Sequence, residues 1–361
     1  MGLGNAKASR RSAAWRFFTH TFSLGSLLVL AFMFLPSTAA AQSTPGPVSG
    51  CETISVSGVY TLSGPIMPSG LPCFDITADN VTLNLSNFSI NAISEGNTGS
   101  VITVGANTGV TIEGGSITTG YSSSLANANA AIEATGATNL TVTGVTIQNQ
   151  DSSATVQCQL TASGTWPSGM QNHGTGIYLN NVAGGNVSAN SVSCYDYGIY
   201  LQGSAVPSNG QGTITGNTVE GNTWTMTLGT QDVLSGGIVL DGSSGWTVNN
   251  NTVDYNGGPD NTTAGCNNTG TGELITCQFD LQVIHGSSGN SITLNTVELG
   301  FTGGIYAGPD VSRNSFTQNT LNAMPFAGLF SSAPNKLKNS WSKNSCGTTQ
   351  SGGTVPHKAC G

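Results

Sequence analysis

The chain has 361 residues and few charges, with 9 Lys and Arg against 17 Asp and Glu and a formal net charge of −8 at pH 7. Four of the nine cations lie in the first 16 residues and all acids lie after residue 41, so residues 42–361 carry 5 − 17 = −12. From Gln42 to Ser312 there is no Lys or Arg at all. Nucleic acids and anionic lipid surfaces are bound through basic patches, so this balance argues against both as partners.

Residues 1–41 are predicted to form a secretory signal peptide. A basic start is followed by an apolar run from Phe22 to Leu35 and by the small-residue cleavage site Ala39-Ala40-Ala41. The apolar run is too short for a membrane-spanning helix, so we expect no membrane span. All eight cysteines follow this segment, which favours disulfides in an oxidising compartment. We therefore expect a secreted, periplasmic or cell-surface protein.

Residues 42–330 contain a six-residue phrase, apolar-x-x-Asn-x-apolar, that occurs five times. The copies centre on Asn190, Asn217, Asn251, Asn295 and Asn319. Three degenerate copies, ending at Ile90, Ile117 and Ile147, precede them. Such a short unit cannot bury its apolar face alone, so the repeat predicts a solenoid of stacked coils. Identical Asn side chains in successive coils are expected to hydrogen-bond as a ladder.

A second strand signature precedes the Asn phrases, as in Gly176-Ile177-Tyr178-Leu179 and Gly198-Ile199-Tyr200-Leu201. Alternation along a strand places Ile and Leu inside the coil and the intervening Tyr outside. Helical periodicity is absent after the signal segment, so the expected fold is all-β.

These paired motifs resemble the parallel β-helix repeats of the pectate-lyase-like superfamily. The segment Gly58-Val59-Tyr60-Thr61-Leu62, with Asn80 to Leu85 after it, is similar to the start of NosD-type repeat proteins. The resemblance covers roughly Cys51 to Phe330 and implies a right-handed parallel β-helix. It implies no single activity, because the superfamily hosts lyases, hydrolases, epimerases, adhesins and non-catalytic proteins.

Alignment of the coils predicts four disulfides and two stapled ends. The pairs are Cys51–Cys73 in an N-terminal cap, Cys158–Cys194 and Cys266–Cys277 at long loops, and Cys346–Cys360 in a C-terminal cap segment, residues 331–361. Caps are expected because an open solenoid end exposes edge strands and core.

Three connectors between an Asn phrase and the next strand are long, and all three leave the same corner of the coil. Two of them, residues 148–176 and 220–237, flank a short connector, residues 193–197, so a groove across the stack is expected. The predicted floor residues are Tyr178, Tyr195, Asp196, Tyr197 and Tyr200, and the predicted wall residues are Trp166, His173, Trp224 and Asp232. Aromatic faces can bind sugar rings, while Asp196, Asp232 and His173 are the catalytic candidates.

Known catalytic motifs of the superfamily are not matched. Polyuronate lyases need a cation to neutralise the substrate carboxylate, and the body of this chain has no Lys or Arg. A calcium ion could replace that cation, although no calcium-loop spacing is present, and no other cofactor is expected. Of the motifs of polygalacturonase-like hydrolases, the chain contains only the partial match Asn172-His173-Gly174. Another pair of carboxylates could still hydrolyse a glycoside, and Glu220 and Asp241 also lie near the loop corner.

Asp241 and His285 each stand 12 residues before the last Val of their phrases, Val253 and Val297. Equivalent positions in consecutive coils lie about 4.8 Å apart, so we expect the two side chains to be neighbours. We interpret them as an exposed cross-strand pair with a structural role.

The sequence thus favours a secreted β-helix protein that binds a neutral or weakly charged polysaccharide, with hydrolysis of that polysaccharide left open. The alternative is a non-catalytic surface or adhesion scaffold. A polyuronate lyase is less favoured, because the body of the chain lacks cations.

Overall fold

The computed structural model describes residues 44–93, 99–121, 129–150, 174–208, 210–222, 235–254, 256, 279–298, 303–322, 327–347, 351–353, 355 and 359–361. All described residues belong to one compact unit, residues 41–361. Among them, no helix is both long and apolar enough to cross a membrane. The predicted signal peptide lies outside the described residues.

Three parallel sheets, which we call A, B and C, build this compact unit. Sheet A contains β1 (Gly46–Val48), β3 (Gly58–Leu62), β5 (Val81–Asn84), β8 (Thr111–Glu113), β11 (Thr138–Thr143), β14 (Ala183–Ser188), β17 (Gly212–Thr215), β20 (Thr247–Asn249), β23 (Ser291–Thr293), β26 (Ser315–Thr317) and β29 (Ser340–Ser342). Sheet B contains β2 (Glu52–Ile54), β4 (Phe74–Ile76), β7 (Ile102–Val104), β10 (Ala130–Thr135), β13 (Thr175–Asn180), β16 (Tyr197–Gln202), β19 (Gly236–Asp241), β22 (Phe279–Ile284), β25 (Gly303–Ala307), β28 (Ala327–Ser331) and β30 (Ser351–Gly353). Sheet C contains β6 (Ser89–Ala92), β9 (Ser116–Thr119), β12 (Thr146–Asn149), β15 (Ser191–Ser193), β18 (Thr218–Glu220), β21 (Thr252–Asp254), β24 (Thr296–Glu298) and β27 (Thr320–Asn322).

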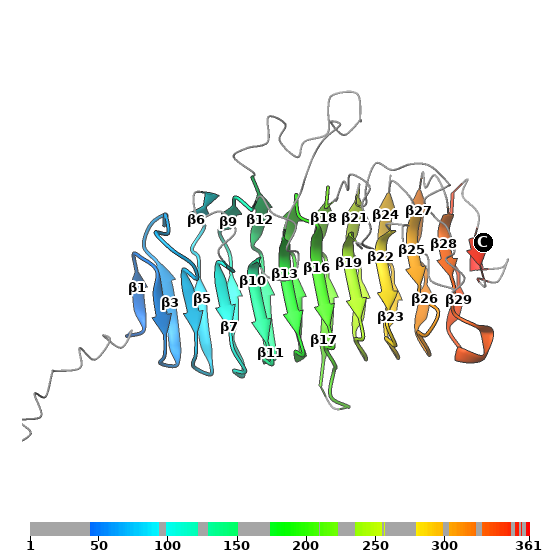
Figure 1. Ribbon diagram of the computed structural model, residues 1–361, viewed down its shortest axis with the longest axis horizontal. Coiled ribbons are helices and arrows are strands. Elements are labelled where there is room, and N and C mark those ends of the chain that lie inside the picture. Colours follow the sequence, from blue (N-terminus) through cyan, green and yellow to red (C-terminus); the bar gives the residue numbers. More distant parts are fainter. Residues whose placement is uncertain are drawn as a thin grey trace, which may run out of the picture. The chain divides into compact units, whose positions relative to one another are not determined.

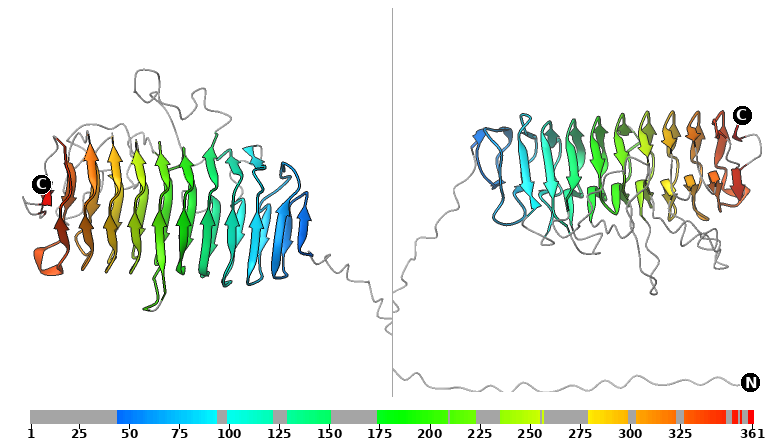
Figure 2. Two further views of the ribbon diagram at one scale, coloured as in Figure 1. Left: turned by 180° about the vertical axis from the view of Figure 1, so that it is seen from behind. Right: turned by 90° about the horizontal axis from the view of Figure 1, so that it is seen from above.

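Each coil runs from sheet B to sheet A to sheet C and then returns to sheet B one layer further along. Figure 1 shows the strands of successive coils side by side in chain order, and Figure 2 shows the same order from behind and from above. Strands of successive coils pair in parallel, as β13 pairs with β16. The predicted parallel β-helix is confirmed.

Apolar columns from all three sheets fill the core. Ile177, Ile199 and Ile238 are register partners in sheet B, and all three are fully buried. Val192 and Val219 form the matching column in sheet C. The prediction that Ile and Leu of these strands face the interior is therefore confirmed.

The predicted Asn ladder is present and is longer than the five repeats indicate. In five successive pairs, an Nδ2 donates to the Oδ1 of the next Asn at 2.9–3.0 Å. The ladder members are Asn190, Asn217, Asn251, Asn295, Asn319 and Asn344. The same Nδ2 atoms also donate to backbone carbonyls, as Asn217 does to Val187 at 2.9 Å. Two shorter ladders were not predicted, namely Asn290–Asn314–Asn339 and Asn222–Asn256–Asp280.

The disulfides Cys51–Cys73 and Cys346–Cys360 form as predicted. Cys194 is also disulfide-bonded, but its expected partner Cys158 lies outside the described residues, as do Cys266 and Cys277. The three long connectors join β12 to β13, β18 to β19 and β21 to β22, so each runs from sheet C to sheet B. The prediction that they leave one corner of the coil is therefore right.

Candidate functional site on the outer face of sheet B

The strands of sheet B carry an outer face of aromatic and polar side chains. In β13, β16 and β19 a glycine near the start of the strand positions that face. A Cβ added to Gly198 would overlap the Val219 side chain of the core, so this residue faces inward. Ile199 also faces inward, which breaks the alternation and leaves both Tyr197 and Tyr200 on the outer face. Gly176 and Gly237 occupy the same position in the neighbouring coils and are similarly crowded by the core.

Three outer tyrosines stack on one another. The rings of Tyr178 and Tyr200 lie 5.5 Å apart at 23°, and those of Tyr197 and Tyr200 lie 4.8 Å apart at 19°. Although they point away from the core, all three are buried, with exposures of 6–8%. The sequence correctly predicts that these tyrosines come together, but their rings pack in a second apolar cluster and are not an open floor.

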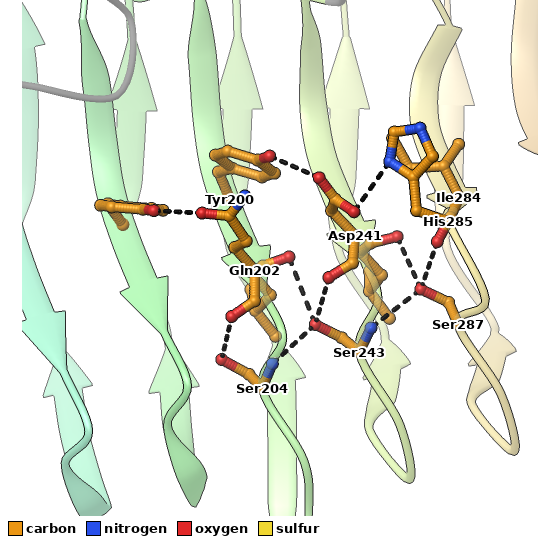
Figure 3. A network of polar contacts seen from close by, with 11 residues as sticks. Tyr200, Gln202, Ser204, Asp241, Ser243, Ile284, His285 and Ser287 are labelled. Atoms are coloured by element: carbon orange, nitrogen blue, oxygen red, sulfur yellow. Dashed lines mark hydrogen bonds and ion pairs between the residues drawn. The ribbon is translucent and has the colours of Figure 1, made fainter. Parts of the chain in front are cut away.

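A polar network lies at the carboxyl ends of the same strands (Figure 3). The Tyr200 hydroxyl donates to Asp241 Oδ2 at 2.6 Å, and His285 Nδ1 lies 2.8 Å from Asp241 Oδ1. The His285 side chain is 49% exposed, whereas that of Asp241 is 15% exposed. Burial, followed by the hydrogen bond to Asp241, raises the pKa of Tyr200 far above its usual range, so the hydroxyl remains a donor. The predicted contact between Asp241 and His285 is confirmed.

The turns that follow these strands are fixed by a ladder of serines. Backbone N–H groups of Ser204 and Ser243 donate to the hydroxyl of the serine in the next coil, at 3.2 and 2.9 Å. These hydroxyls also donate to backbone carbonyls, as Ser287 does to Ile284 at 2.7 Å (Figure 3). Ser287 also donates to the Leu240 carbonyl, at 3.0 Å. The polar side chains that end the strands therefore stand on a turn whose geometry repeats from coil to coil.

Asp241 sets the chemistry that the network can perform. A carboxylate that accepts a bond from the imidazole Nδ1–H selects the tautomer in which Nε2 is the basic nitrogen. It also stabilises the imidazolium that forms when Nε2 takes up a proton. The arrangement can thus orient a hydroxyl group or transfer a proton.

Asp196 is in a different environment from the one expected. It is 1% exposed, and neither carboxyl oxygen forms a hydrogen bond of normal geometry with a described residue. Burial raises the pKa of Asp196 well above its usual range, and the nearby Gly174 backbone opposes this only in part. The Ser235 hydroxyl, one coil further on, is likewise buried and has no hydrogen-bond partner in the described part of the chain. The prediction that Asp196 lies on an open groove floor is wrong.

Tyr195 is also misplaced by the sequence pattern. It is fully buried in the core, its hydroxyl lies 3.0 Å from that of Thr119, and its ring lies 6.4 Å from that of Tyr121. The reason is the left-handed backbone of Cys194 (φ 72°), which breaks the alternation on which the prediction rested. The other predicted site residues, Trp166, His173, Trp224 and Asp232, lie outside the described residues.

Two features of the outer face were not anticipated. Gln202, which accepts a bond from the Tyr178 hydroxyl at 2.5 Å, was overlooked because an amide at a strand end carries no motif. Gln282 is buried and donates to the Ser235 and Phe279 carbonyls at 2.7 and 3.1 Å. Among the described residues, no group of three or more His, Cys, Asp or Glu could hold a metal ion.

The repeat architecture has a counterpart among known protein families. Residues 75–280 match the family model described as a right handed beta helix region. No curated protein matches the chain. One similar solved structure is the crystal structure of a mutant of the periplasmic alginate epimerase AlgG, with 12% identity, a TM-score of 0.44, and coverage of 87% of this chain and 77% of that chain. Because the family model matches more than half of the chain, this protein belongs to the right-handed β-helix family.

Proposed function

We propose that this protein is exported and binds a polysaccharide along the outer edge of sheet B, where β13, β16, β19 and β22 end. The observation that carries the proposal is a row with one polar side chain per coil: Asn180, Gln202, Asp241 and His285. None of these four is buried. The buried tyrosines beneath hold the row in place, through bonds to Gln202 and Asp241.

The repeat of the row suits a polymer of sugars. Coils of parallel strands follow one another at about 4.8 Å, so hydrogen-bonding groups recur at a regular interval along the stack. A polysaccharide lying parallel to the stack also presents its hydroxyl groups at a regular interval. Amide, carboxylate and imidazole groups orient such hydroxyls.

The charge of the body favours a neutral or weakly charged polysaccharide. No Lys or Arg occurs from Gln42 to Ser312, and Asp241 adds a negative charge within the row itself. A polyuronate would be repelled by this surface unless a cation such as calcium bridged the two.

A second candidate function, hydrolysis of the bound polysaccharide, is supported by the 2.8 Å contact between His285 and Asp241. In that reaction water attacks the anomeric carbon, the glycosidic C–O bond breaks, and a proton passes to the leaving oxygen. The imidazole held by Asp241 would transfer that proton. The alternative from another class remains a non-catalytic surface or adhesion scaffold.

A panel of soluble polysaccharides tests these proposals. We expect retention of at least one neutral or weakly charged polymer, with Gln202→Ala and Asp241→Asn weakening binding severalfold. Thr247→Ala, on the outer face of sheet A, is the matched control and should bind as the wild type does. Release of reducing ends, abolished by His285→Gln, would identify a hydrolase. Failure of every polymer to bind would favour the scaffold alternative.

A further inference from the structure

Charge is completely segregated along the chain after the predicted signal peptide. All 17 Asp and Glu lie from Glu52 to Asp310, and no Asp or Glu follows. All five Lys and Arg lie beyond that point, at Arg313, Lys336, Lys338, Lys343 and Lys358. In a solenoid, position along the chain is position along the stack. The body of the helix is therefore acidic, and its C-terminal coils are basic.

Arg313 and Lys338 occupy the same turn position in consecutive coils. Arg313 follows β25 and Lys338 follows β28, and the Arg313 N–H donates to the Leu337 carbonyl at 2.9 Å. The residues after them, Asn314 and Asn339, are consecutive members of one amide ladder. The two backbones are thus about 4.8 Å apart along the stack. Both have a left-handed conformation, with φ of 56° and 58°. In the two preceding coils, Gly245 and Gly289 occupy the equivalent position and also have positive φ.

These side chains surround an open depression. Its volume is about 390 Å³, and it is lined by Ser312, Arg313, Lys336, Leu337 and Lys338. The three cations are exposed, and among the described residues the one salt bridge is that of His285 with Asp241. Like charges in adjacent coils repel one another, so an anion held between them would be favoured.

We propose that this depression binds the acidic substituent, a carboxylate or sulfate, of an otherwise neutral polysaccharide. The proposal rests on the proposed function. His285, Arg313 and Lys338 lie in the turns from sheet B to sheet A of three successive coils. A single polymer lying along that corner would contact both regions. The Arg313 guanidinium can pair with both oxygens of a carboxylate or sulfate. Leu337 and Ser312 add an apolar surface and a hydroxyl for the sugar ring.

Three probes with the same neutral backbone isolate the acidic substituent: dextran, carboxymethyl dextran and dextran sulfate. We expect the full-length mature protein to bind an acidic dextran at least tenfold more tightly than dextran, with an advantage that shrinks as salt is added. The carboxymethyl and sulfate probes distinguish the two acids. The double variant Arg313→Gly/Lys338→Gly places at both positions the glycine found at the equivalent position of the preceding coils. In this variant the tighter binding of the acidic dextrans should disappear. Lys343→Ala removes an exposed cation outside the depression and should retain it.

Equal affinity for all three probes, or an undiminished advantage in the double variant, would overturn the inference. If duplex DNA binds as tightly as the acidic dextrans, the ligand of the depression is a nucleic acid and the inference of a glycan ligand is overturned. Self-association at low salt that the double variant abolishes would identify the ligand as the acidic body of a second copy. If the protein binds a neutral polysaccharide but does not prefer the acidic dextrans, this inference is wrong and the proposed function stands. If the protein binds the acidic dextrans but no neutral polysaccharide, the proposed binding site on sheet B is wrong and the depression remains a binding site for acidic groups.

Discussion

At the scale of single residues, two buried carboxyl groups stand out because they lack the partners that a buried charge requires. Among the described residues, none forms a hydrogen bond of normal geometry with either carboxyl oxygen of Asp196. Asp280 occupies the inward position that is glycine in the neighbouring coils. Its Oδ1 accepts bonds from Asn256 at 2.9 and 3.1 Å, whereas Oδ2 has no partner among the described residues. Burial raises the pKa of both groups well above the usual range.

These shifts predict how stability depends on pH. A carboxyl whose pKa is raised by folding holds its proton in the native state and releases it in the unfolded state at about pH 4. Its contribution is complete below that pH and is lost as pH rises toward the raised native pKa. We expect Asp196→Asn and Asp280→Asn to leave the urea midpoint unchanged at pH 3.5 and to raise it at pH 8. Asp310→Asn, at an exposed carboxyl, is the control. Parallel pH profiles for the wild type and both variants would contradict the assignment.

Part of the polar site could be predicted from the spacing of residues in the sequence. Asp241 and His285 were predicted as neighbours because both stand at one distance from their repeat phrases. The strand register pairs Asp241 with Ile284, so His285 lies one residue beyond that partner, in a left-handed conformation (φ 49°), and still contacts Asp241. The bond from Tyr200 to Asp241 was not predicted, since it joins different positions of consecutive coils. Tyr195 was misplaced because a left-handed residue, Cys194, has no signature in the sequence.

At the scale of elements, the strands and the main ladder could be predicted because their residues recur at a fixed spacing. The second amide ladder, Asn222–Asn256–Asp280, could not be predicted in the same way. Its members adjoin the connectors of variable length and one is a carboxylate, so no common phrase contains them. The main ladder ends at Asn344, beyond the last repeat that the pattern recognises.

The main ladder gives the second prediction. Asn217→Leu removes the acceptor of the Asn190 N–H and Nδ2 groups and the donor to the Val187 carbonyl, all of them buried. Each orphaned group costs about 1–3 kcal/mol, so a drop of several kcal/mol in the free energy of unfolding is expected from urea titration. Asn186→Leu is the matched control, because Asn186 is a half-buried amide on the outer face of β14. Equal midpoints for Asn217→Leu and the wild type would exclude a stabilising role for the ladder.

At the scale of the whole β-helix, stability is passed from coil to coil. Strands pair with the preceding and following coils, so interior coils have two neighbours and terminal coils have one. The chain has a disulfide at each end, Cys51–Cys73 and Cys346–Cys360. Covalent links at the ends stabilise the coils that pairing stabilises least.

The last prediction follows from that one-dimensional coupling. Cys360 adjoins Gly361 and Ala359, whose backbones bond to Asn344, the last member of the main ladder. The Cys346–Cys360 bond spans 14 residues, for which chain entropy predicts roughly 3 kcal/mol of stabilisation. In Cys346→Ala/Cys360→Ala we expect β28 and β29 to exchange their amide hydrogens faster, while β13 to β17 keep their protection. Cys51→Ala/Cys73→Ala should affect only the coils of β1 to β5. Acceleration of every coil by the same factor would instead show that the helix unfolds as a single unit.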